Sequence, residues 1–173
     1  EWGPEKKEIT FHLRKGIKWS DGEPLTAEDY AFYYNEILKN DELPEFPPIM
    51  MGGEEVEFKK IDKYTIKYIF PQISVLALQQ HFVYGLSAPA HYYKQFHPEY
   101  NENINKWNKM REKLVEIETP YLDPNRPVLQ AWKVESWEQG DQIVAKRNPY
   151  YWKVDTEGNQ LPYIDKILSN NYL

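Results

Sequence analysis

Short runs in which apolar and polar residues alternate recur along the sequence, and they limit the fold to one built around half-buried strands. Residues 9–13 alternate in this way and predict a strand. Residues 56–70 repeat the pattern on both sides of a turn at 62–63, which predicts a β-hairpin. Residues 129–135 and 142–146 predict a second, hairpin-like pair.

Helical segments alternate with these strands. Thr26 is the predicted N-cap of a helix from about Ala27 to about Leu38, because Asp29 stands where a capping box places its carboxylate. Further helices are predicted over residues 103–116 and from near Ser74 and Pro89. The sequence therefore predicts an α+β fold with a mixed, mainly antiparallel sheet and flanking helices. We expect that sheet to draw on the segments near Ile9, Val56, Tyr64, Ala131 and Ile143.

Length and charge narrow the class of protein. The chain has 173 residues, enough for one compact domain with its own core, so we expect residues 1–173 to form a single domain. The formal net charge is −6, and the acids are dispersed rather than gathered in a block. Such a chain, without a basic stripe, disfavours nucleic acids and anionic membranes as partners.

Residue types that usually carry catalysis or hold metals are absent or unsuitably spaced. The chain contains no cysteine, which excludes disulfides, thiolate nucleophiles and cysteine-ligated metals. None of the four histidines stands four residues from another, as a zincin-type helix requires. Ser74 and Ser87 lack the G-x-S-x-G setting of a serine nucleophile. We therefore predict no catalytic residue, no metal site and no cofactor.

Aromatic residues carry the remaining functional signal. They make up 16% of the chain, more than a minimal core needs. Trp132 and Trp137 flank a predicted strand, where packing is the commoner role of such side chains. The alternative role is a platform on which a sugar ring or a peptide side chain stacks. Trp132 and Trp137 are accordingly our candidate ligand-binding residues.

Three blocks, in order along the chain, resemble the motifs of one family. Residues 9–30 read ITFHLRKGIKWSDGEPLTAEDY, which is similar to the signature of the family 5 bacterial extracellular solute-binding proteins. Residues 61–68 resemble the hairpin of that family, and residues 88–92 resemble its I-x-P-x-H-Y segment. Residues 140–165 resemble its block around R-N-P-x-Y-W. In one departure, residues 125–132 stand where the family often has G-T-G-P-Y.

The resemblance implies a two-lobed periplasmic-binding-protein-like fold of type II, cluster C, whose lobes close on a ligand. It covers nearly the whole chain but a minority of a full family member. We therefore expect a monomeric fragment of domain I that includes the small subdomain. A ligand site shared by two lobes would be half missing from it.

The resemblance also implies a function. The parent protein would be the substrate-binding component of an ABC importer, located in the periplasm or on the cell surface as a lipoprotein, and not an enzyme. It would bind oligopeptides and deliver them to the membrane permease. An alternative ligand is a β-linked oligosaccharide, which would suit the aromatic content. A hypothesis of another class is a glycan-active enzyme or a carbohydrate-binding module.

Overall fold

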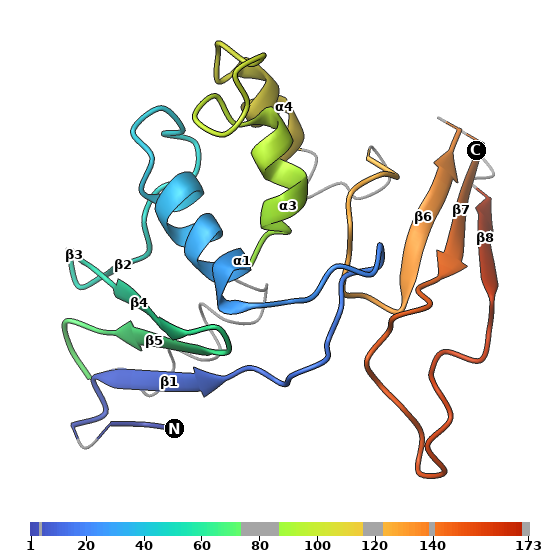
Figure 1. Cartoon of the computed structure of the whole chain (residues 1–173), viewed down its shortest axis with the longest axis horizontal. Coiled ribbons are helices and arrows are strands. Elements are labelled where there is room, and N and C mark those ends of the chain that lie inside the picture. Colours follow the sequence, from blue (N-terminus) through green and yellow to red (C-terminus); the bar gives the residue numbers. More distant parts are fainter. Residues whose placement is uncertain (4, 74–86, 116–122, 139–140, 171–173) are drawn as a thin grey trace. The chain divides into compact units, whose positions relative to one another are not determined.

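The computed structural model describes residues 1–3, 5–73, 87–115, 123–138 and 141–170 (Figure 1). The chain divides into two compact units. The first unit is formed by residues 1–15 and 26–90, and the second by residues 16–25 and 91–173. The expectation of a single domain over residues 1–173 stays a prediction. The helix predicted from Ser74 lies outside the described residues.

An antiparallel sheet forms the base of the first unit. Its strands are β1 (Glu8–His12), β5 (Thr65–Ile69) and β4 (Glu57–Asp62), in the order β1-β5-β4 (Figure 1). A small pair, β2 (Met50–Met51) and β3 (Glu54–Glu55), is antiparallel as well. The strand and the hairpin predicted for this region are confirmed. The turn falls one residue later than predicted, since Asp62 pairs with Thr65 and its carboxylate accepts a hydrogen bond from the Tyr64 amide at 2.7 Å.

Helix α1 (Ala27–Phe32) continues directly into the π-helix η1 (Tyr33–Leu38), which confirms the predicted helical segment. The predicted capping box is present. The Thr26 side chain accepts a hydrogen bond from the Glu28 amide at 3.2 Å, and the Asp29 carboxylate accepts one from the Thr26 amide at 2.9 Å. Both bonds satisfy amides that a helix start would otherwise leave unpaired.

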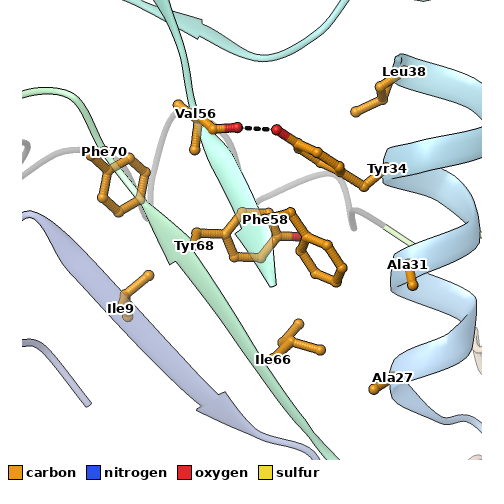
Figure 2. Packing of buried hydrophobic residues seen from close by; sticks show 10 residues of the cluster. All are labelled: Ile9, Ala27, Ala31, Tyr34, Leu38, Val56, Phe58, Ile66, Tyr68 and Phe70. Carbon is orange, nitrogen blue, oxygen red and sulfur yellow. Dashed lines mark hydrogen bonds between the residues drawn. The ribbon is translucent and has the colours of Figure 1, made fainter. Parts of the chain in front are cut away.

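The core of the first unit lies between α1 and the sheet, as Figure 2 shows. Tyr34 reaches from the helical segment to the sheet, where its hydroxyl donates to the carbonyl oxygen of Val56. Its ring stacks on Phe58 with centroids 5.2 Å apart. Burial of each large apolar side chain contributes about 1.5–3 kcal/mol. The cluster consists of Ile9, Ala27, Ala31, Tyr34, Leu38, Val56, Phe58, Ile66, Tyr68 and Phe70.

The second unit combines helices with another antiparallel sheet. Its helical elements are α3 (Ala90–Tyr93), whose first residue belongs to the first unit, η2 (Lys94–Phe96) and α4 (Asn108–Val115). The sheet has the order β6-β7-β8, with β6 (Trp132–Trp137), β7 (Gln142–Arg147) and β8 (Lys166–Asn170). These elements confirm the helix predicted near Pro89 and the second hairpin. Across the parts of the chain that the structure describes, every helix is too short or too polar to cross a bilayer.

Two predictions about the fold need correction, although the α+β class and the antiparallel pairing are confirmed. The five predicted strand segments do not share one sheet, because β1 and β4 both pair with β5, whereas β6 and β7 pair in a separate sheet. An alternating pattern identifies the buried side of a strand but not its partner. The helix predicted over 103–116 begins only at Asn108, since the Asn101 side chain accepts a hydrogen bond from the Asn103 amide at 3.0 Å and holds a turn there.

Asp29 carries out a second task in the first unit. Its buried carboxylate also accepts a hydrogen bond from the Ala90 amide at 3.0 Å, so one side chain ties the start of α1 to the start of α3. Replacement by Ala leaves two buried amides without an acceptor. We expect Asp29→Ala to lower the free energy of unfolding by about 3 kcal/mol, measured by urea denaturation.

The matched control is Glu28→Ala, one residue earlier. Glu28 forms an exposed ion pair with Lys60 at 2.6 Å, and exposed pairs contribute below about 1 kcal/mol. Equal losses in the two variants would show that the buried bonds of Asp29 do not stabilise this part of the fold.

A second buried carboxylate lies in the second unit. Asp123 is 3% exposed and accepts hydrogen bonds from the Tyr92 hydroxyl at 2.5 Å and from Nζ of Lys113 at 3.1 Å. Burial, the largest single influence, raises the pKa of Asp123, but the hydrogen bonds and the charge of Lys113 outweigh it and lower this pKa below its usual range.

Stability should therefore depend on pH through Asp123. The stabilising contribution is fully present above the pKa of an unfolded aspartate, about 4, and is lost as the pH falls through the lower pKa of the folded state. We expect Asp123→Asn to flatten the acid side of a plot of unfolding free energy against pH. An acid-side slope in Asp123→Asn identical to that of the unsubstituted chain would contradict the assignment.

Candidate ligand-binding site

One extra residue in β6 decides where Trp132 and Trp137 lie. Trp132 pairs with Arg147 and Trp137 pairs with Ile143, while Glu135 is the additional residue of a β-bulge. The two tryptophans are five positions apart in the sequence, which in a regular strand would place them on opposite faces. Their partners on β7 are four residues apart, so the bulge places both tryptophans on one face of the sheet.

This face carries several apolar side chains and one charged one, Arg147, which pairs directly with Trp132. Residues directly opposite one another on paired strands share a face, which groups the tryptophans with Val134, Ile143 and Ile167. The two tryptophans are separated by roughly 13 Å along the sheet, at 3.3 Å per residue over four residues. That spacing suits an extended ligand longer than a single sugar ring or amino acid.

Both tryptophans are half-buried, so each has a packing role and an accessible part. Nε1 of Trp132 donates a hydrogen bond to the carbonyl oxygen of Ile164 at 3.2 Å, which fixes the orientation of its ring. A fixed ring loses little freedom when a ligand stacks on it. The structure thus places the two candidate residues on one face, and their contact with a ligand stays a prediction.

A pocket of about 330 Å³ lies within the second unit. Its lining comes from β6, β7 and the turns near residues 20, 124 and 149, and it includes neither tryptophan. The sequence does not reveal this pocket, because its residues are scattered along the chain and meet only in the folded unit. The lining residues are Ser20, Pro124, Asn125, Lys133, Val134, Glu135, Lys146, Arg147 and Pro149.

Positive charge dominates the pocket. Lys146 forms an ion pair with Glu135, and Nε of Arg147 lies 3.1 Å from Oδ1 of Asp165. Lys133 has no ion pair within the described ranges. The pocket therefore contains three cationic residues and one acid, and it suits an anionic group better than a cation.

The aromatic segment after the pocket is used largely for packing. The Tyr150 ring lies against Gly22, where an added Cβ would come within 3.1 Å of it, and Nζ of Lys18 lies 5.2 Å from its centroid. The fully buried Asn148 donates to the carbonyl of Gln130 at 3.0 Å and accepts from the Tyr150 amide at 2.9 Å. Trp152 remains 40% exposed.

No metal centre emerges from the parts of the chain that the structure describes. Within them, His, Asp and Glu residues do not gather in groups of three or more with a geometry that could hold an ion. The chemistry available on the sheet is therefore stacking on the face with the tryptophans and attraction of anions at its cationic pocket.

Comparison with protein families gives a match over nearly the whole chain. The model described as bacterial extracellular solute-binding proteins, family 5 middle, matches residues 1–171. The periplasmic alpha-galactoside-binding protein of Rhizobium meliloti (strain 1021) is 34% identical over 175 residues, which cover 96% of this chain and 24% of that protein.

Solved structures agree with this match. A structure of oligopeptide-binding protein OppA has 35% sequence identity and a TM-score of 0.80, covering 100% of this chain and 29% of that one. MelB from Agrobacterium fabrum C58, a periplasmic binding protein solved in complex with stachyose, has 34% identity and a TM-score of 0.79, covering 99% and 25%. This chain thus spans between about a quarter and a third of the length of these proteins.

Proposed function

The chain belongs to family 5 of the bacterial extracellular solute-binding proteins, and on this premise we propose that its parent protein is the solute-binding component of an ABC importer. The observation that carries the proposal is the family match over residues 1–171. In this proposal the parent protein captures a solute outside the cytoplasm and delivers it to a membrane permease. The family is one of binding proteins and not of enzymes, and curated relatives such as the alpha-galactoside-binding protein and OppA of Salmonella typhimurium are periplasmic.

Within the parent protein, we assign the chain to a part of domain I that includes the small subdomain. Exposed apolar side chains support this assignment. Outside the strands, Ile73 is 61% and Ile164 60% exposed. Apolar surface of this kind is usually covered in a larger protein. A ligand site formed by two lobes would then be only half contained in these residues, so the chain by itself should bind weakly or not at all.

The ligand that we propose first is an oligosaccharide with α-galactosyl units. Two relatives at 34% identity support it, one named for alpha-galactosides and one solved with stachyose. The sequence favoured an oligopeptide, with a β-linked oligosaccharide as the alternative ligand, and these relatives shift the proposal to α-linked sugars. The spacing of Trp132 and Trp137 on one face agrees with an elongated sugar.

An oligopeptide is the second candidate. The structure of OppA, similar at 35% identity, supports it, as do curated oligopeptide-binding relatives such as OppA of Salmonella typhimurium (strain LT2) at 28% identity. Peptide side chains can stack on tryptophan in the same way as sugar rings. The stacking face therefore does not discriminate between the two candidates, and a titration must.

Calorimetric titration of the full-length protein against stachyose and against a pool of tri- to pentapeptides would separate them. We expect saturable heat with stachyose and none with the peptides, and heat with the peptides alone would assign the second candidate. The 173-residue chain is the matched control and should give little heat with either. Saturable binding of neither class by the full-length protein would contradict both proposed ligands.

Substitution of the tryptophans tests the stacking face directly. We expect Trp132→Ala and Trp137→Ala each to weaken ligand binding about three- to tenfold, because one aromatic contact contributes about 0.5–1.5 kcal/mol beyond the area that it buries. Trp152→Ala, at an exposed tryptophan outside the sheet, is the control. Unchanged affinity in the first two variants would leave Trp132 and Trp137 as packing residues only.

A further inference from the structure

Three lysines form a row across the second sheet. Lys133 on β6 lies directly opposite Lys146 on β7, which in turn lies directly opposite Lys166 on β8. Paired residues share a face, and neighbouring strands are about 4.8 Å apart. The row therefore concentrates three positive charges within roughly 10 Å on the face opposite Trp132 and Trp137.

Like charges directly opposite one another destabilise a sheet. The first sheet contains such a pair as well, Lys59 opposite Lys67, but there each lysine has its own carboxylate. Glu57 lies 3.1 Å from Lys59, and Glu8 lies 3.0 Å from Lys67. That sheet neutralises its repulsion internally.

The lysine row is compensated only in part. The ion pair between Glu135 and Lys146 is the one that the structure gives these three lysines in the residues it describes. Two positive charges remain, on a chain whose formal net charge is −6. The excess of positive charge weakens this sheet. Features that cost stability in this way are expected at functional sites, so the excess indicates a binding role.

The pocket supplies a place for the missing negative charge. Lys133 and Lys146 both line it, together with Ser20 and Asn125. The Ser20 hydroxyl accepts a hydrogen bond from the Val128 amide at 3.0 Å, which leaves its proton available to donate. The Asn125 side chain adds amide donors. Ammonium, hydroxyl and amide donors together match an oxyanion, whose oxygens only accept.

We propose that Lys133, Lys146 and Lys166 form a binding site for a small oxyanion with several carboxylate or phosphate groups. Lys133 and Lys146 hold one anionic group in the pocket, and Lys166 extends the row to a second group. Several charges on one ligand match the repeat of the row, whereas a single charge would leave one lysine uncompensated. The site is separate from the proposed transport function, and it depends on neither tryptophan.

Calorimetric titration of the full-length protein with citrate and with pyrophosphate, at an ionic strength of about 0.01 M, tests the site. Citrate represents carboxylates and pyrophosphate represents phosphates, so the two arms identify the chemistry. We expect saturable binding of at least one probe. Lys133→Gln and Lys166→Gln should each weaken it about tenfold, the effect of one lost charge-assisted hydrogen bond.

Two controls sharpen the result. Lys106→Gln removes the same charge from an exposed position of the second unit outside the pocket, and it should leave the affinity unchanged. Lys133→Arg keeps the charge and should retain binding. No saturable heat with either probe, or equal weakening in the Lys106 and Lys133 variants, would overturn the site. Stachyose titrated in parallel tests the proposed transport ligand separately. A negative result for the anion site therefore does not affect the test of the transport function, and the reverse also holds.

Discussion

The pairing of β6 with β7 around one extra residue determines what the second unit can bind. Without the bulge at Glu135, Trp137 would lie on the face opposite Trp132. With it, one face of the sheet presents two tryptophans and the other presents a row of lysines. Glu135 also provides the carboxylate that pairs with Lys146. The bulge residue therefore offsets part of the positive charge of the three lysines.

Buried polar side chains hold the irregular segments of both units. Asp29 joins the start of α1 to the start of α3, and Asp123 joins α3 to α4 through Tyr92 and Lys113. Asn148 fixes the turn after β7 by accepting a hydrogen bond from the Tyr150 amide and donating one to the carbonyl of Gln130, which precedes β6. Each of these groups is satisfied by hydrogen bonds, which is the condition for burying it without a large cost.

Local features of the fold, including both hairpins, were predictable from the sequence, and the pairing of strands far apart in the chain was not. The capping box at Thr26 and the hairpin that ends in β5 depend on residues close together in the chain, and both are confirmed. The division of the strands into two sheets depends on partners far apart, which an alternating pattern does not specify. Trp132 and Trp137 could be identified as candidates because they are aromatic. Their position on one face of the sheet depends on a β-bulge, which the residue types around it do not predict. The lysine row likewise exists only once the register is known.

The two faces of the second sheet can act independently, because strand alternation gives them different side chains. A sugar or peptide stacked on the tryptophans contacts the π faces of rings and needs no charge, whereas an oxyanion at the lysine row is held by ammonium groups that salt screens. Raising the ionic strength should therefore weaken anion binding and leave stacking nearly unchanged. Any coupling between the faces would have to pass through the shared backbone of β6 and β7, since Trp132 and Lys133 are neighbours in the chain but point to opposite sides. Rigid pairing on both sides of β7 opposes such coupling, so occupancy of one face should not regulate the other.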